Sequence, residues 1–141
     1  MGHANLGATV SSLAKVTGVC DVWKVRRYAA KQAYPDATAY TDYRESLEAK
    51  DIGGVIVATP PHWHALISVD ATRAGKDIYV QKPTTLHVGE SLTLRNAVNH
   101  HGRVCYRLER RFTRAKIIVV VWRLCVQKYW SKFHVCACSM S

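Results

Sequence analysis

Apolar positions alternate between helical spacing and short continuous runs over most of the chain. Spacings of three and four residues predict helices, and short apolar runs bounded by turn residues predict strands. The expected helices cover residues 6–17, 25–33, 42–49, 61–74 and 94–101, and the expected strands cover 16–20, 39–40, 54–58, 77–80 and 103–108. The repeated order of strand and helix predicts an α/β fold with a doubly wound parallel sheet, which binds ligands at the carboxyl ends of its strands.

The first candidate site motif is Gly2-His3-Ala4-Asn5-Leu6-Gly7, a G-x-A-x-x-G pattern directly before a predicted helix. Small residues there let the backbone approach a pyrophosphate, and N–H groups at the helix start meet the phosphates. Asp21 lies further along, at the end of a predicted strand, where a carboxylate accepts ribose hydroxyls. We therefore expect a Rossmann-like dinucleotide site.

The strand that leads into this glycine loop in a Rossmann fold is expected to be missing, because only Met1 precedes Gly2. Its neighbours near Val19 and Val55 would then each expose an unpaired backbone edge. Residues 113–141 form an irregular basic tail, set apart from an incomplete dinucleotide-binding domain at 1–112. The β-prone run 116–126 in this tail is expected to pair with the sheet or with another chain.

The second constellation follows two strands that we expect to be neighbours. Thr59, Pro60 and Pro61 come after the apolar run 54–58, with His62 and His64 directly behind, and Gln81-Lys82-Pro83 follows the strand 77–80. The carboxyl ends of parallel strands share one edge of a sheet, so both motifs should face one crevice.

Residues 2–112 resemble the N-terminal domain of the glucose–fructose oxidoreductase and inositol dehydrogenase family, Gfo/Idh/MocA. The stretches that carry the resemblance are Val19-Cys20-Asp21-Val22, Asp42-Tyr43-Arg44-Glu45, Ala58-Thr59-Pro60-Pro61-His62-Trp63-His64-Ala65, Ala74-Gly75-Lys76-Asp77-Ile78-Tyr79-Val80 and Lys82-Pro83.

The resemblance implies an NAD(P)-dependent oxidoreductase acting on a sugar, cyclitol or polyol. It implies that Thr59, Pro60 and Pro61 line the nicotinamide with His64 beside them. Lys82 matches the lysine of the family's Glu-Lys-Pro motif, where an ammonium can polarise a substrate hydroxyl as hydride leaves. Gln81 stands where the family usually has Glu. Nothing after Phe112 resembles the family's substrate domain, so the chain is expected to be a fragment without turnover by itself.

The cofactor is expected to be NAD rather than NADP. A carboxylate at position 21 repels a 2′-phosphate, although Arg26 and Arg27 nearby leave NADP possible.

Composition and charge bear on membrane partners, location and nucleic-acid partners. Charged residues make up 21% and no apolar stretch is long enough to span a membrane, so no membrane partner is expected. Five cysteines suggest no disulfide framework, and a cytoplasmic location is expected. Half of the net charge of +10 lies in residues 113–141 without any nucleic-acid-binding motif, so no nucleic acid is expected.

Two alternative functions remain, and the sequence also bears on metal binding and oligomeric state. The chain could be a non-enzymatic remnant, or a binding module whose basic tail contacts an acidic partner; salt-dependent binding to polyanions would favour the module. No metal is expected, because neither the pair His62 and His64 nor the cluster His134, Cys136 and Cys138 has the ligand spacing of a structural site. A homo-oligomer is possible.

Overall fold

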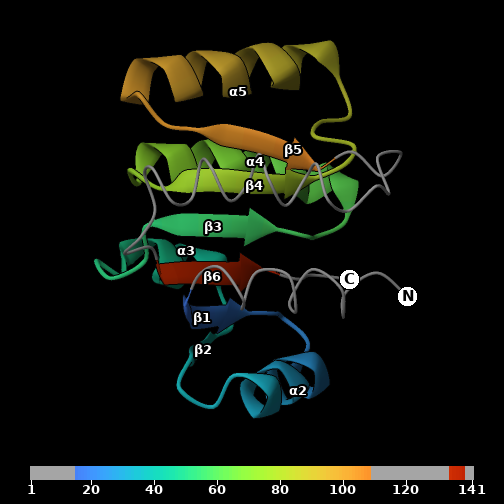
Figure 1. Cartoon of the computed structure of the whole chain (residues 1–141). Coiled ribbons are helices and arrows are strands. Elements are labelled where there is room, and N and C mark those ends of the chain that lie inside the picture. Colours follow the sequence, from blue (N-terminus) through green and yellow to red (C-terminus); the bar gives the residue numbers. More distant parts are fainter. Residues whose placement is uncertain (1–14, 109–133, 139–141) are drawn as a thin grey trace, which may run out of the picture.

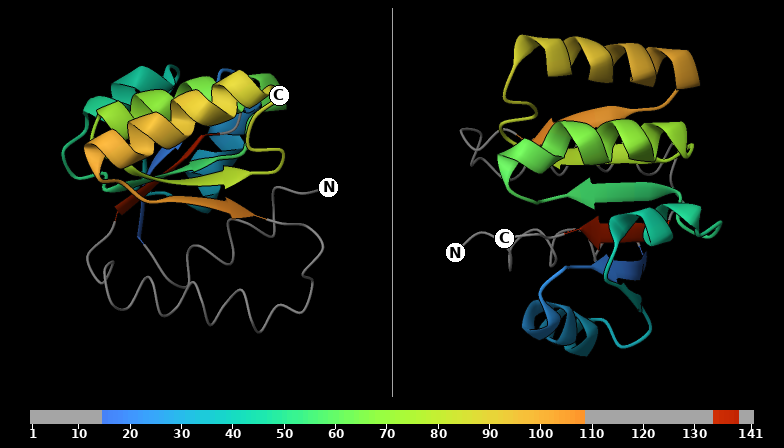
Figure 2. Two further views of the ribbon diagram at one scale, coloured as in Figure 1. Left: turned by 90° about the horizontal axis from the view of Figure 1, so that it is seen from above. Right: turned by 180° about the vertical axis from the view of Figure 1, so that it is seen from behind.

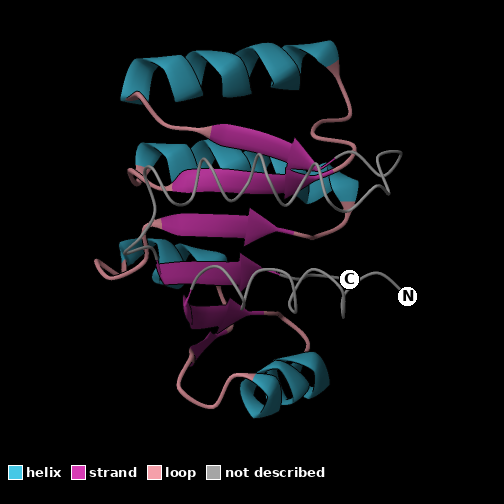
Figure 3. Ribbon diagram, viewed as in Figure 1, coloured by secondary structure: helices cyan, strands magenta, loops and turns pink. Residues whose placement is uncertain are grey.

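The computed structural model describes residues 15–108 and 134–138, which form one parallel sheet with helices packed against it (Figure 1). The strands are β1 (Lys15–Cys20), β2 (Thr38–Tyr40), β3 (Gly54–Val57), β4 (Asp77–Gln81), β5 (Cys105–Leu108) and β6 (His134–Cys138). The helices are α2 (Lys24–Ala33), α3 (Tyr43–Glu48), α4 (Pro61–Arg73) and α5 (Val88–His101). Figure 3 shows how helices and strands alternate along the described chain.

The sheet has the order β2-β1-β6-β3-β4-β5, and each pair of neighbours is parallel. From the centre, the chain runs outward through β1 and β2 on one side and through β3, β4 and β5 on the other. This is the 3-2-1-4-5-6 order of a dinucleotide-binding sheet, with β6 in the central position. The doubly wound fold expected from the sequence is therefore confirmed.

The expected vacancy beside β1 and β3 is occupied, which corrects that prediction. β6 pairs with β1 from Lys15↔His134 to Cys20↔Cys138, and with β3 from Gly54↔Val135 to Val57↔Cys138. Val19 and Val55 consequently pair on both sides instead of lining open edges. The segment that fills this place is 134–138. The run 116–126, which was expected to pair with the sheet or with another chain, lies outside the described residues. Part of the tail thus belongs to the same sheet as residues 15–108.

Most of the other predicted elements are confirmed to within a few residues, except that α5 begins at Val88, six residues before the predicted start at 94. α4 begins at Pro61, where a proline costs no intrahelical hydrogen bond, and is followed by Gly75 at φ 76°. α5 is followed by Gly102 at φ 59°. Asp42 caps α3, because its side chain accepts a hydrogen bond from the Arg44 backbone N–H. The helix expected over 6–17 lies outside the described residues up to position 14, and its last positions belong instead to β1.

The core lies between the sheet and the helices on one of its faces. Figure 2, viewed from above, shows α3, α4 and α5 together on that face. β3 is buried along its whole length, as expected of a central parallel strand, and α4 contributes Ile67, Val69 and Ala71 to the same core. Among the described residues, the main apolar contacts of the sheet therefore lie on the face that these helices cover.

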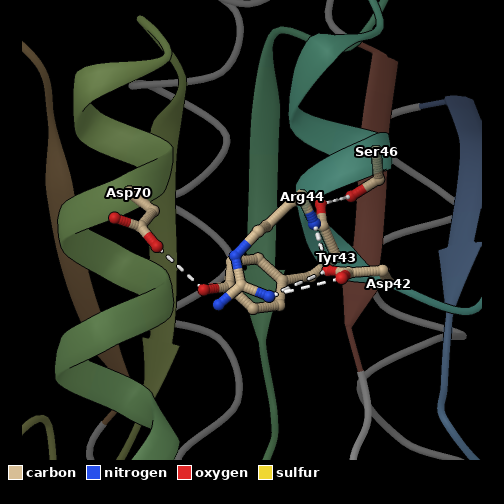
Figure 4. Close-up of polar contacts among 5 residues, drawn as sticks. All are labelled: Asp42, Tyr43, Arg44, Ser46 and Asp70. Carbon is tan, nitrogen blue, oxygen red and sulfur yellow. Dashed lines mark hydrogen bonds and ion pairs between the residues drawn. The ribbon is translucent and has the colours of Figure 1, made fainter.

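A partly buried hydrogen bond links α3 to α4 (Figure 4). The Tyr43 hydroxyl donates to Asp70 Oδ2 at 2.8 Å, and Ser46 Oγ donates to the Tyr43 carbonyl at 2.6 Å. Burial, with the hydrogen bond and the charge of Asp70, raises the pKa of Tyr43 to about 12. The phenol therefore remains a donor throughout the neutral range.

Candidate functional site

The candidate site residues gather at one edge of the sheet because all six described strands run in the same direction. Asp21 follows β1 directly, and Thr59 lies shortly after the end of β3. Gln81 is the last residue of β4, and Lys82 follows it. We call this the carboxyl edge. The motif after β3 and the motif after β4, which are separate in the sequence, are brought together there by the pairing of these two strands.

Asp21 is buried, with 3% of its surface exposed, and its position is fixed by its own loop. Oδ1 accepts a hydrogen bond from the Trp23 backbone N–H at 2.8 Å, where the chain turns into α2. The Asp21 backbone N–H donates to the Tyr40 carbonyl, and Arg27 Nη1 donates to the Asp21 carbonyl at 2.8 Å. The Trp23 bond uses one of the two carboxylate oxygens.

Two arginines of α2, Arg26 and Arg27, follow Asp21 along the chain, and only Arg27 has a hydrogen bond to it. Arg27 is held by its bond to the Asp21 backbone. Arg26 places its guanidinium 5.1 Å from the centre of the Trp23 ring, and its Nη1 is buried without a hydrogen-bond partner among the described residues. A buried guanidinium nitrogen without a hydrogen-bond partner lowers the stability of the fold. A hydrogen-bond acceptor of a ligand would therefore bind favourably at this nitrogen.

His64 joins the loop after β3 to the loop after β4. Its side chain is 1% exposed; Nε2 lies 2.7 Å from the Thr59 carbonyl oxygen and Nδ1 lies 2.5 Å from the Pro83 carbonyl oxygen. Both oxygens can only accept, so a ring nitrogen that carries a proton donates to the carbonyl oxygen it faces. The sequence indicated that His64 belongs to the site, but its link to the distant Pro83 had no sequence signal.

Thr59 and Thr84 contribute buried hydroxyls without partners on these same two loops. Thr59 is 5% exposed, and its Oγ1 makes no hydrogen bond within the described residues; the same is true of Thr84 Oγ1. Thr84 follows the cis Lys82–Pro83 bond and was not singled out from the sequence. The two hydroxyls are free to bind a polar group that enters at this edge.

The remaining residues of the second motif are more exposed. Pro60 and Gln81 are half-buried, and Pro61, His62 and Lys82 are exposed. Lys82 makes no hydrogen bond or ion pair with any other described residue. The His62 ring lies 6.0 Å from that of Trp63, which packs partly against the core. An exposed ammonium at the carboxyl edge is accessible to a substrate.

Five expected site residues lie outside what the structure describes: Gly2, Ala4, Asn5, Leu6 and Gly7. The side chains of His134, Cys136 and Cys138 also lie outside it. Within the described ranges, no group of three potential metal ligands lies together. No described helix is both long and apolar enough to cross a membrane.

The carboxyl edge fits a dinucleotide cofactor. It offers a buried carboxylate after the strand next to the centre, where a ribose is held in Rossmann sheets. It also offers polar groups without partners among the described residues, on α2 at one side of the centre and in the loops after β3 and β4 at the other. A ligand spanning this edge would give acceptors to Arg26 and partners to the two threonine hydroxyls. The class of protein defined by the fold and this edge is a dinucleotide-binding Rossmann domain.

The chain belongs to the Gfo/Idh/MocA family. Residues 2–108 match its "Oxidoreductase family, NAD-binding Rossmann fold". Among curated relatives, an alpha-N-acetylgalactosaminidase from Shewanella oneidensis is 28% identical over 116 residues, covering 75% of this chain and 25% of the relative. A glycosyl hydrolase family 109 protein from Shewanella sp. (strain W3-18-1) is 31% identical over 98 residues, covering 66% and 21% respectively. The matched part thus spans about a quarter of the relatives' length.

Solved structures give the same fold. The WlbA dehydrogenase from Bordetella pertussis, in complex with NADH and UDP-GlcNAcA, superposes with a TM-score of 0.72 at 17% identity over 89% of this chain and 36% of its own. Levoglucosan dehydrogenase, in complex with NADH and levoglucosan, gives a TM-score of 0.59 at 29% identity over 65% of this chain and 25% of its own.

Proposed function

We propose that this chain is the NAD(H)-binding domain of an oxidoreductase that acts on a sugar, cyclitol or polyol. The observation that carries the proposal is the convergence of Asp21, Thr59 and Lys82 at one edge from three different strands. Relatives with bound NADH and sugar-type ligands support the cofactor and the substrate class. Bound NAD⁺ would supply a hydride acceptor; the chain's own residues bind it, orient it and contact the substrate.

Each part of the edge has a separate role in this proposal. Asp21 accepts hydrogen bonds from the adenosine ribose hydroxyls through the carboxylate oxygen that Trp23 leaves open. The segment Gly2–Gly7, with Ala4, Asn5 and Leu6, meets the pyrophosphate. The loop Thr59-Pro60-Pro61 lines the nicotinamide, with His62, His64 and Gln81 around it.

Lys82 is the proposed catalytic residue. Its ammonium is exposed at the end of β4, beside the loop that would face the nicotinamide. Hydrogen bonding from this ammonium to a substrate hydroxyl would orient the carbon that gives up hydride. Gln81 beside it is neutral and half-buried, so it adds no negative charge that could hold the lysine in place.

The geometry around Asp21 favours NAD over NADP. A buried carboxylate at the ribose position repels a 2′-phosphate, and Arg27 is occupied by the Asp21 carbonyl. Arg26 is the remaining cation that could balance the charge of a 2′-phosphate.

The free thiols of Cys20 and Cys105 are consistent with the reducing cytoplasm as the proposed location.

Replacing Asp21 by asparagine tests this assignment. Asn keeps an acceptor for the Trp23 N–H but removes the charge, so we expect NADH affinity to fall by about 1–3 kcal/mol while NADPH affinity does not fall. Fluorescence titration of both cofactors measures the two affinities. Asp42→Asn, at the carboxylate that caps α3, is the matched control and should leave both unchanged. Equal NADH affinity of wild type and Asp21→Asn would remove Asp21 from the site.

A further inference from the structure

The central strand of the sheet comes from the far end of the described chain. β5 forms one edge of the sheet, and residues 109–133 separate it from β6, which lies between β1 and β3 (Figures 1 and 2). β6 runs parallel to both neighbours, so its carboxyl end at Cys138 reaches the carboxyl edge beside Cys20 and Val57.

This position makes β6 the spacer between two halves of the candidate site. Asp21 follows β1 and Thr59 follows β3, so their backbones stand two strand spacings apart, about 9–10 Å. The backbone groups of β1 and β3 that face each other across this interval have their partners on β6. Among the described strands, only β6 pairs with both β1 and β3, and the other contacts that connect these two strands run through the helices α3 and α4 and the shared core.

We infer that residues 134–138 bind as a strand between β1 and β3, and that this binding of one segment of the chain to another assembles the dinucleotide site. The interval between the two strands is then a binding site for an extended peptide, and its occupant is a segment of the same chain. Cofactor binding depends on that segment, although the ribose carboxylate and the nicotinamide loop both lie within residues 15–108. The inference rests on the proposed function for its link to NADH.

Amide hydrogen exchange and NADH titration on the full chain test it together. In the wild type, the amides of residues 134–138 should exchange slowly, together with those of Val19 and Val55. Ala137→Pro removes a backbone N–H from a strand that is paired on both sides, so we expect NADH affinity to fall by about tenfold or more. Ala137→Gly, which keeps the N–H, is the matched control and should stay within about threefold of wild type.

The outcomes separate the strand's role from the proposed function. Unprotected amides at 134–138 in a wild-type chain that binds NADH would overturn the inference, and so would wild-type NADH affinity in Ala137→Pro. Protection that depends on protein concentration would also overturn it, because the strand would then come from another copy. Protected amides without any NADH binding would reject the proposed function, and with it the role in cofactor binding.

Discussion

At the scale of single residues, His64 connects the parts of the candidate site. It belongs to α4, yet its ring contacts carbonyls of the loops that follow β3 and β4. The loops after these two strands are therefore fixed to one buried ring. Its function in the proposal is to position the nicotinamide loop and not to contact the substrate.

Replacing His64 by phenylalanine should loosen this connection without emptying the space. Whichever carbonyl accepts from the imidazole, that of Thr59 or that of Pro83, would lose its donor, at a cost of about 1–3 kcal/mol for a group left buried and unpaired. Urea unfolding monitored by circular dichroism measures the loss. His100→Phe makes the same change at an exposed position of α5 and serves as the control. Stability of His64→Phe equal to wild type would show that the ring only fills volume.

The residue types of the site could be read from the sequence, but their partners could not. Asp21 and Thr59 were predicted at strand ends, and both lie there. Arg26 Nη1 and Thr84 Oγ1 emerged only from the structure, because the absence of a hydrogen-bond partner depends on how the surrounding loops fold. Local sequence carries no information about that.

At the scale of elements, the ends of α4, the start of α3, the end of α5 and the buried strands β3 and β4 were predicted well because their signals are local. Pro61 begins α4, Gly75 and Gly102 adopt left-handed conformations after α4 and α5, and Asp42 caps α3. The hydrogen bond between Tyr43 and Asp70 joins two separate helices and had no such signal. The contribution of this bond to stability can be measured through the pH dependence of the free energy of unfolding.

Tyr43 should make the fold sensitive to alkali. Its pKa is raised from 10.0 to about 12 in the folded chain, so the unfolded chain loses this proton first as pH rises. The stabilisation is complete below pH 10 and is lost as pH rises toward about 12. A rise of this size in the pKa corresponds to at most about 2–3 kcal/mol.

Tyr43→Phe should therefore flatten the fall in the free energy of unfolding over this range. Tyr79, whose pKa burial also raises to about 12, keeps part of the slope in that variant. Urea unfolding at a series of pH values provides the measurement. An unchanged slope in Tyr43→Phe would show that this phenol ionises equally in both states.

At the scale of the whole molecule, the sequence predicted the sheet and its winding but not the source of the central strand. The run 116–126 has more β-branched residues than 134–138 and was the expected candidate. Strand propensity reports whether a segment suits a sheet, not which neighbours it pairs with. β6 is identified by its register with β1 and β3, two strands that lie far from it along the chain.

The 141-residue chain by itself should bind NADH without turning over a sugar or polyol. Lys82 is exposed and has no partner among the described residues, so nothing described here orients a substrate or excludes water around it. Absorbance at the NADH band during incubation with NAD⁺ and inositol or a hexose tests this. Steady NADH production that disappears in Lys82→Ala would contradict it.

The central claim is that the carboxyl edge of the sheet binds NADH, and chemical-shift mapping of backbone amides tests it most directly. On titration with NADH, we expect shifts at Asp21, at Thr59 and at residues 81–84, with little change at the opposite edge, around Gly53, Lys76 and Arg103. Shifts confined to the opposite edge, or none at saturating NADH, would contradict the account.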